Sequence, residues 1–368
     1  MSWAADEFRD LDLGDKRREA RAVLLAERLA DKPTASLPGA CSGWAETQGA
    51  YRLFRQETFD WLDLLEPHRA CTTQRMVAHP VVLCLQDTTE LDFNGQQIQG
   101  LGPLSYEAQR GMYLHPTLAV SPAREPLGVL DAWMWAREPK AEDGTRGGEK
   151  ESTRWVEGYT RVAELAEQLE HTRLVYVGDR ESDMLELMVR AHERGHAADY
   201  LLRSQHDRAL PDGKKLWRDV LATASLGEVR FVLPPTKTRK SRPVRQQLRA
   251  KRVTLCDRRG GQLQVTCVIA TEVNPPPGET PIEWRLLTNR DVKDFAAAAE
   301  LVDWYRARWE IELFFLVLKQ GCRVEALQLS TIARIEKALV LFMIVAWRIA
   351  RLMRLGRTCP ELDAALLF

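Results

Sequence analysis

Four polar side chains recur at helical spacing near the C-terminus, in a segment otherwise rich in large apolar residues. They are Tyr305, Arg308, Glu312 and Lys319. At about 100° per residue they share one stripe about 60° wide, so we expect a single helix to present all four on one face. A helix that is apolar nearly all round is normally buried. A buried phenol, two cations and a carboxylate need partners, and phosphate groups and metal ions would supply them.

Two aspartates, Asp87 and Asp179, each follow a short apolar run typical of a buried strand. These runs are Val81–Gln86 and Arg173–Gly178. If the two strands lie side by side, the carboxylates converge, and convergent carboxylates bind hard divalent cations through oxygen. With Glu312 they would hold two Mg²⁺ or Mn²⁺ ions roughly 3.5–4 Å apart, which clamp the attacking and leaving oxygens of a phosphodiester. Either aspartate alone is weak evidence, because aspartate often simply ends a strand.

The overall composition is that of a globular protein. The chain has 368 residues, of which 45% are apolar and 28% charged, enough for two or three domains. Its 52 cationic and 52 anionic side chains cancel, so a DNA-binding surface would have to come from local patterning. Seven dispersed cysteines suit free thiols in a reducing cytoplasm. The longest apolar run, 338–347, is too short to span a bilayer, and no secretory leader opens the chain, so we expect no membrane partner.

The order of expected elements divides the chain into four parts. Residues 1–76 are expected to be helical. Residues 77–204 follow the order β-β-β-α-β-α-β, which is that of the ribonuclease H-like fold. Residues 205–290 form a β-rich insertion, and residues 291–368 return to the helices of the core. The predicted fold class is therefore α/β, with a five-stranded mixed sheet flanked by helices, interrupted by the insertion and preceded by an all-α domain.

Helix boundaries follow from capping residues and apolar periodicity. Ser42 would cap a helix that continues through Phe54, and Ser182 would cap a helix over residues 183–194. Further helices are expected at residues 16–30, 152–169, 292–320 and 331–355. Strands beyond the two above are expected at residues 112–120, 127–135 and 199–203.

Two segments carry a local excess of positive charge. Residues 16–56 contain eight cations and four anions, Arg17 and Arg18 among them. Such a module docks on DNA in many proteins and is equally common on a solvated surface. Between Glu228 and Asp257 nine cations occur without an acid. We favour contact with a polyanion over a merely solvated hairpin there, and the predicted DNA contacts are Lys237, Arg239, Lys240 and Arg242.

In combination these motifs resemble a known family. The spacing Tyr305-x2-Arg308-x3-Glu312-x6-Lys319 is that of the Tyr-Arg-Glu-Lys signature of DDE transposases of insertion-sequence-four type, which include the transposase of transposon five. Asp87-Thr88-Thr89 resembles the first aspartate block of that family, and Gly178-Asp179-Arg180-Glu181 resembles the second. Residues 13–18 and 49–55 resemble its N-terminal DNA-binding domain, and residues 274–284 its β-rich insertion.

The resemblance implies roles for individual residues. Asp87, Asp179 and Glu312 would be the catalytic triad that binds two Mg²⁺ or Mn²⁺ ions. The residues that hold phosphates near the transposon end would be Tyr305, Arg308 and Lys319. Trp284 matches the tryptophan on which a flipped terminal base stacks, although a core aromatic at a strand start is a simpler alternative. Arg154 and Arg203 match cationic positions near the active site.

The function implied is DNA transposition by a cut-and-paste route. The enzyme would hydrolyse the 3′ ends of an insertion sequence at its inverted repeats, form and resolve hairpins, and join the ends to target DNA. Its partners would be double-stranded DNA and a second copy in a synaptic complex, in the cytoplasm of a bacterium at the nucleoid. Family members continue past the position of Phe368 into a helical dimerisation region that is largely absent here. A truncated, non-transposing DNA-binding remnant or inhibitor is therefore the alternative. A general ribonuclease H-like nuclease is a third reading, against which the signature and Trp284 argue.

Overall fold

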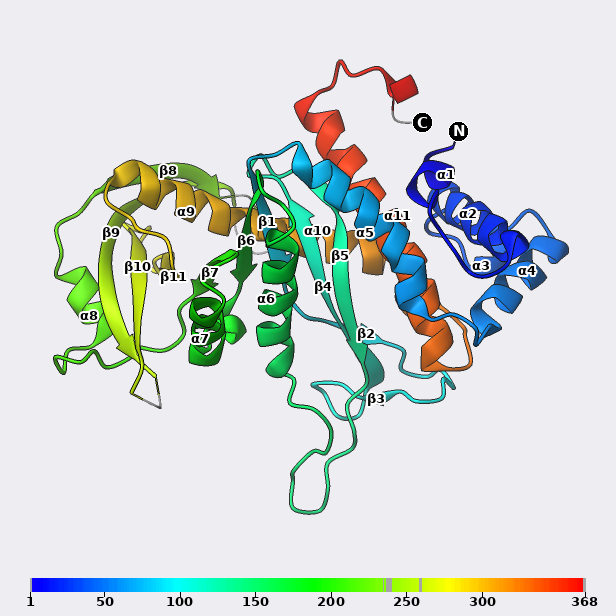
Figure 1. Cartoon of the computed structure of the whole chain (residues 1–368), viewed down its shortest axis with the longest axis horizontal. Coiled ribbons are helices and arrows are strands. Elements are labelled where there is room, and N and C mark those ends of the chain that lie inside the picture. The colour runs from blue at the N-terminus through cyan, green and yellow to red at the C-terminus, as the bar shows by residue number, and fades with distance from the viewer. Residues whose placement is uncertain (1, 234, 236–239, 258–259, 367–368) are drawn as a thin grey trace. The chain divides into compact units, whose positions relative to one another are not determined.

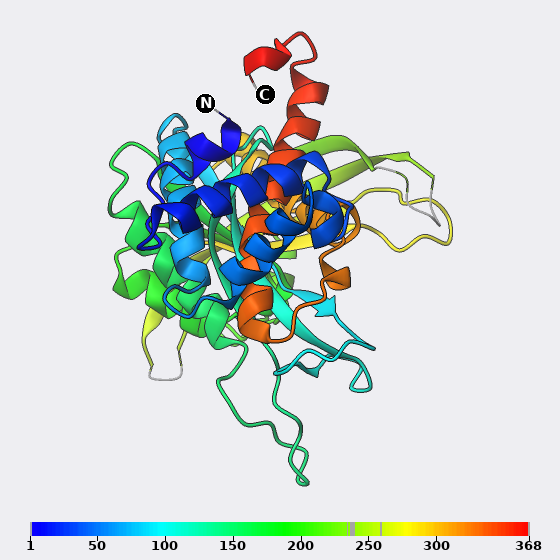
Figure 2. The same ribbon diagram turned by 90° about the vertical axis from the view of Figure 1, so that its right-hand side faces the viewer.

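Figures 1 and 2 show the computed structural model, which describes residues 2–233, 235, 240–257 and 260–366. The chain forms two compact units. The first unit comprises Met1–Lys150 and Trp309–Phe368, and the second unit is Glu151–Arg308. The chain thus leaves the first unit once and returns to it within the segment that carries the four signature residues.

The first unit contains an antiparallel sheet with β4 (Arg110–Val120) at its centre. Strand β4 pairs with β1 (Val81–Gln86), β2 (Thr89–Asp92), β3 (Gly102–Pro103) and β5 (Pro126–Trp135). Residues 82–86 of β1 are all buried. Two long helices, α5 (Trp61–Val77) and α11 (Ile332–Thr358), pack on β5. The apolar run at 338–347 forms the buried middle of α11, as the sequence indicates.

The N-terminal region of the first unit is helical, as expected. Its helices before α5 are α1 (Trp3–Glu7), α2 (Lys16–Asp31), α3 (Leu37–Ala40) and α4 (Trp44–Arg55). Helices α2 and α4 pack on each other and on α11, shown orange to red in Figure 2. Asp15 caps α2, because its side chain accepts the backbone N–H of Arg17 at 2.8 Å.

The second unit contains a mixed sheet whose strands run in the order β6-β7-β11-β10-β9-β8. Strands β6 (Arg173–Gly178) and β7 (Asp199–Arg203) are parallel, and every later pairing is antiparallel. The remaining strands are β8 (Gly227–Leu233), β9 (Arg242–Cys256), β10 (Gln262–Glu272) and β11 (Glu283–Thr288). Helices α6 (Thr153–Ala166), α7 (Leu185–Glu193), α8 (Leu216–Leu221) and α9 (Phe295–Ala307) belong to the same unit. The mixed α/β class is therefore confirmed.

The β-rich insertion is not a separate sheet. Strand β11 pairs with β7, where Leu286 lies opposite Arg203 and Leu287 opposite Leu202. The insertion strands thus extend the sheet from β7 and cover an edge that would otherwise expose unpaired backbone groups. The sequence predicted a β-rich insertion, but its charge, Pro and Gly patterning does not indicate which strand pairs with which.

Two predicted helix caps are wrong. Helix α4 has Gly43 at its N-cap, with φ at 141°, and the backbone N–H of Ser42 instead donates to Glu46. Ser182 ends a short 3₁₀ turn, Arg180–Ser182, which the side chain of Asp179 caps. Helix α7 starts later, at Leu185, without a side-chain cap. Serine is permissive at several turn positions, so its presence alone does not locate a helix start.

The single helix expected over 292–320 is also wrong. Helix α9 ends at Ala307, α10 runs Trp309–Leu316, and Val317–Gly321 form a π-helical turn. The backbone N–H of Arg308 bonds to the carbonyl oxygen of Tyr305, three residues back, which tightens and ends α9. Trp309 and Leu316 are exposed, so α10 is not buried all round. No helix in the described part of the chain is long and apolar enough to cross a membrane.

Candidate active site

Asp179 stands at the end of a fully buried strand segment in the second unit. Residues 174–178 of β6 are buried and Asp179 is half-buried. Its Oδ1 accepts the backbone N–H of Glu181 at 2.8 Å, and its carbonyl oxygen accepts the hydroxyl of Ser182 at 2.6 Å. A side chain at Gly178 would meet the Ser182 hydroxyl oxygen at 2.4 Å, so the turn requires glycine. The turn therefore fixes the direction of the Asp179 carboxylate.

Three further predicted site residues gather with Asp179 in the same unit. Strands β6 and β7 are parallel, with Gly178 opposite Leu202, so Asp179 and Arg203 leave the sheet at the same edge. Tyr305 lies in the last turn of α9 and Arg308 directly follows that helix, and both residues are buried. Burial raises the pKa of the Tyr305 hydroxyl, as does the Asp179 carboxylate, while the guanidinium groups of Arg308 and Arg203 oppose that rise. The phenol stays protonated at neutral pH and can donate a hydrogen bond to an anion.

An aromatic series leads away from this group. The ring centroids of Trp284 and Tyr305 are 6.1 Å apart and meet at 60°. On β8, Phe231 stacks on Trp284 with centroids 5.6 Å apart and planes at 17°. Trp284 is half-buried, so part of its side chain remains accessible. An indole that remains partly accessible suits stacking on an unpaired base.

Asp87 lies in the first unit, at the end of β1. Its Oδ1 accepts the backbone N–H of Thr88 at 2.9 Å, and the Thr88 hydroxyl contacts Nδ1 of His115 at 2.8 Å. Nε2 of His115 lies 3.1 Å from the Gln86 side-chain oxygen, and Gln86 donates to Thr117 at 2.6 Å. His115 and Gln86 are buried. A continuous polar network therefore supports the backbone on both sides of Asp87.

Glu312 and Lys319 also belong to the first unit. Glu312 is exposed in the first turn of α10, and Lys319 lies in the π-helical turn. The Lys319 ammonium donates to the carbonyl oxygen of Glu90 at 2.8 Å and pairs with Glu325 at 3.1 Å. Lys319 thus connects the end of the signature to β2, which follows the Asp87 block directly. The four signature residues are divided, two in each unit.

The donor set is suited to a hard cation. Asp87, Asp179 and Glu312 offer carboxylate oxygens, the ligands that Mg²⁺ and Mn²⁺ prefer. Within the described residues, no three side chains of histidine, cysteine, aspartate or glutamate are placed as a ready metal site. The chemistry of the residues fits such ions, and their joint use in one site remains a prediction.

Most other predicted DNA contacts have partners within the protein. Arg17 is exposed beside Asp15, and Arg18 bonds to Leu13 and Thr58. Arg242 pairs with Glu272 and Glu279, which gives it a role in holding β9 to β10. Among the others, Arg154 is buried on α6, Lys240 is exposed, and Lys237 and Arg239 lie outside the described residues.

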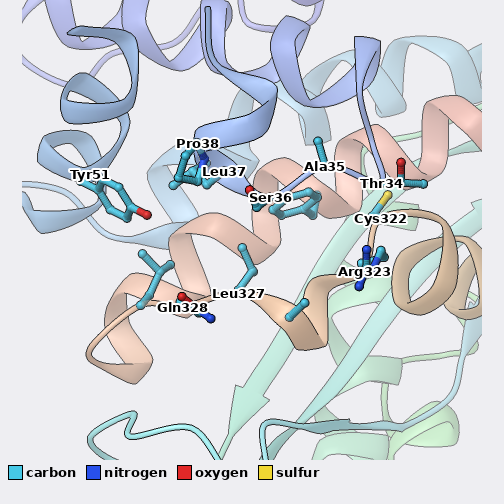
Figure 3. Close-up of a pocket in the computed structure, with 13 residues that line it drawn as sticks. Thr34, Ala35, Ser36, Leu37, Pro38, Tyr51, Cys322, Arg323, Leu327 and Gln328 are labelled. Atoms are coloured by element: carbon cyan, nitrogen blue, oxygen red, sulfur yellow. The ribbon is translucent and has the colours of Figure 1, made fainter. Parts of the chain in front are cut away.

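Figure 3 shows a pocket of about 430 Å³ in the first unit. It lies between the start of α3 and the segment 322–329, and Tyr51 and Phe342 also line it. No acidic residue lines it. The pocket therefore offers no site for a divalent cation, and the candidate chemistry lies elsewhere.

Sequence reasoning missed three residues of the candidate site: Phe231, Arg306 and His115. The Arg306 guanidinium lies 4.3 Å from the centre of the Phe231 ring. Arg306 precedes Arg308 by two positions and falls on another face of a helix, so the spacing of the signature does not indicate it as a site residue. His115 had one available signal, a histidine inside an otherwise apolar strand, which requires a hydrogen-bonding partner.

Models of known protein families match three stretches of this chain. Residues 1–59 match the model described as Transposase DNA-binding, and residues 152–348 match the Transposase DDE domain, more than half of the chain. The chain belongs to the DDE transposases. Asp179 and Glu312 fall within the matched DDE range, whereas Asp87 precedes it. This transposase is thus an enzyme that acts on DNA, and its DDE domain implies dependence on divalent metal ions.

The end of the transposase matches a further model. Residues 344–368 match the Transposase Tn5 dimerisation domain, so part of the region expected to be largely absent is present, beginning within α11. A solved structure, the cryo-EM structure of the piggyBac transposase synaptic complex with hairpin DNA, is similar over 96% of this chain and 72% of that chain. Its sequence identity is 10% and its TM-score 0.44, a likeness too weak to carry an argument.

Proposed function

We propose that this DDE transposase is of the insertion-sequence-four type and performs cut-and-paste transposition at the inverted repeats of its element. The observation that carries the proposal is the grouping of Asp179, Arg203, Tyr305 and Arg308 in one unit. A carboxylate beside two guanidinium groups and a protonated phenol is suited to hold a phosphodiester against a metal-binding oxygen.

The core would be ribonuclease H-like, with Asp87, Asp179 and Glu312 holding two Mg²⁺ or Mn²⁺ ions. Bound ions of this kind lower the pKa of an attacking water or hydroxyl and stabilise the leaving oxyanion. The turn that Asp179 caps and the network beside Asp87 would keep both carboxylates in position, which limits the reorganisation needed when DNA arrives.

The reaction sequence needs no covalent enzyme intermediate. Water attacks the phosphorus at the transposon end, the P–O3′ bond breaks, and the end keeps a 3′-hydroxyl. That hydroxyl attacks a phosphorus of the opposite strand, displaces the 3′-hydroxyl of the flanking DNA and so forms a hairpin. Water then attacks the hairpin phosphorus and releases the transposon 3′-hydroxyl. This hydroxyl finally attacks a phosphorus of target DNA and displaces a target 3′-hydroxyl. Arg203 and Arg308 would bind the non-bridging phosphate oxygens, and Tyr305 would donate a hydrogen bond to one of them. Lys319, whose ammonium donates to the carbonyl oxygen of Glu90 on β2, would hold a phosphate near the transposon end.

Hairpin formation demands a sharp bend that unstacks a terminal base, at a cost of a few kcal/mol. Stacking of that base on the Trp284 indole would return about 1–3 kcal/mol. Trp284 is half-buried and its ring centroid lies 6.1 Å from that of Tyr305, which supports this role.

Cleavage of end-containing DNA with Mn²⁺ tests the proposal. Asp179→Ala is expected to abolish nicking while binding of the end persists. Glu186→Ala, an exposed position on α7 in the same unit, is the matched control and should nick normally. Nicking that survives Asp179→Ala would overturn the proposal. Tight end binding without nicking under any metal, in the unaltered chain, would favour the non-transposing DNA-binding remnant.

A further inference from the structure

The stack of Phe231 on Trp284 is an unusual contact within the sheet of the second unit. Phe231 lies on β8 opposite Val244 of β9, and Trp284 lies on β11 opposite Ala270 of β10. Two strands, β9 and β10, therefore separate the two residues in the sheet order. Neighbouring strands are about 4.8 Å apart, so a flat sheet would hold β8 and β11 about 14 Å from each other. The two rings nevertheless stack, with centroids 5.6 Å apart, so this contact joins two strands that are not neighbours in the sheet.

A cation completes this arrangement. The Arg306 guanidinium lies 4.3 Å from the Phe231 ring centre and is itself held by Asp303 at 3.1 Å. Both Phe231 and Trp284 are half-buried, and the next residue on β8, Val232, is exposed. Core packing would bury both rings fully, whereas a partly exposed aromatic pair beside a guanidinium is the construction used to stack bases of single strands.

We propose that Phe231 is a positioning residue for base capture: it holds the Trp284 indole in the orientation that receives an unpaired nucleobase of the DNA end. The inference rests on the proposed role of Trp284 and extends it. A centroid distance of 5.6 Å is that of rings in direct offset contact, so no base fits between them. Phe231 thus covers part of the indole, and the base stacks on the part that remains. The Arg306 guanidinium, 4.3 Å from the centre of the Phe231 ring, adds a second contact to Phe231.

Fluorescence of 2-aminopurine, placed in turn at each of the last three positions of the end DNA, reports the unstacked base. Phe231→Ala is expected to reduce the fluorescence gain on binding, and the rate of hairpin formation, by about threefold to tenfold, with first-strand nicking retained. Phe231→Tyr should restore both readouts because it keeps the ring, whereas Phe231→Leu should not. An unchanged signal in Phe231→Ala would overturn the inference. So would an increased signal, because Phe231 would then occupy the place of the base.

A parallel Trp284→Ala variant separates this inference from the function on which it rests. Loss of the fluorescence gain in both Trp284→Ala and Phe231→Ala supports the base-stacking role of Trp284 and the positioning role of Phe231. Loss in Trp284→Ala with a normal Phe231→Ala overturns the role of Phe231 alone. A normal signal in Trp284→Ala overturns the base-stacking role of Trp284, and the inference about Phe231 falls with it.

Discussion

Tyr305 illustrates how burial and charge together prepare one side chain. Burial and the Asp179 carboxylate raise the pKa of its hydroxyl, and the nearby Arg308 and Arg203 guanidinium groups act in the opposite direction. The hydroxyl therefore remains a hydrogen-bond donor through the physiological range. A hydrogen-bond donor beside two cationic groups is suited to bind an anion, and DNA phosphate is the anion on which this family of enzymes acts.

Tyr305→Phe should accordingly weaken single-turnover cleavage of end DNA by about tenfold, the effect of losing one hydrogen bond to a charged group. The ring stays, so the contact with Trp284 and the thermal stability should change little. The measurement is single-turnover nicking with Mn²⁺, beside thermal unfolding of both proteins. Equal cleavage rates would show that the hydroxyl takes no part.

Single residues could be predicted where the pattern that indicates their position lies next to them in the sequence. Asp87 and Asp179 could be placed at strand ends because an apolar run precedes each, and both strands have the predicted bounds. Phe231 could not be predicted, because its contact with Trp284 crosses two strands of the sheet and therefore depends on the tertiary structure. No spacing rule along the chain encodes such a contact.

The strand β9 carries a basic sequence, yet it uses Arg242 structurally. Arg242 makes a bidentate pair with Glu272, one bond of which is 3.1 Å, and reaches Glu279 at 2.8 Å. Both partners of the Glu272 pair have largely buried side chains. Removal of one member of such a pair leaves the other charge without compensation, which costs more than loss of an exposed pair.

Arg242→Ala is therefore expected to lower the free energy of unfolding by about 3 kcal/mol. Arg245→Ala is the matched control on the same strand: its pair with Glu228 is exposed, and its loss should cost under about 1 kcal/mol. Urea titration of both variants provides the comparison. Similar losses in the two would mean that the Arg242 pair does not hold the strands.

Another element-scale feature fastens α1 to the sheet of the first unit. Glu7 at the end of α1 contacts Nδ1 of the buried His68 at 2.5 Å and also pairs with Arg75 at 2.9 Å. Nε2 of His68 accepts the backbone N–H of Val129 at 2.9 Å, so the imidazole is neutral with its proton on Nδ1. Burial alone would raise the pKa of Glu7, but the bonds from His68 and Arg75 lower it to about 2.

A carboxylate whose pKa is lowered in the folded protein stabilises the fold at pH values above its ordinary pKa of 4.5. That stabilisation is lost as the pH falls towards the folded-state pKa of about 2. Glu7→Gln should therefore cost about 3 kcal/mol at pH 7, with the difference from the unaltered protein shrinking below pH 4.5. Asp6→Asn, at the exposed neighbouring position, is the control for the loss of one negative charge from α1. Urea titrations across this range decide the matter, and a difference independent of pH would contradict the assignment.

Elements were predicted well where periodicity was strong and poorly where a backbone detail decided. Helix α11 and strands β1, β6 and β7 lie where apolar patterns placed them. The end of α9 was not predicted, because it depends on the backbone hydrogen bond from the Arg308 N–H to the carbonyl oxygen of Tyr305. The residue types in the sequence do not indicate that bond. The boundary between the two units follows Arg308, between the two pairs of signature residues.

At the scale of the whole molecule the charges cancel, so DNA binding must come from local patches. Arg17, whose side chain is 92% exposed at the start of α2, lies in the stretch that matches the transposase DNA-binding model. A phosphate contact by such a residue strengthens binding to all sequences alike.

Arg17→Ala should weaken binding to end DNA and to random duplex by the same factor, and reduce the slope of log affinity against log salt by about one. Lys293→Ala, which removes a cation whose side chain is 81% exposed outside that stretch, is the control and should leave the slope unchanged. Binding isotherms over a series of salt concentrations give both slopes. An unchanged slope in Arg17→Ala would remove Arg17 from the interface.

We propose that carboxylates from three distant parts of the chain hold ions in one site. Fe²⁺ in place of Mg²⁺, with ascorbate and peroxide, generates radicals that cut the backbone close to the bound metal. We expect cuts near positions 87, 179 and 312 in one sample, all suppressed by excess Mn²⁺ and all lost in Asp179→Ala. Cuts confined to one of the three positions, or cuts that persist in Asp179→Ala, would contradict it.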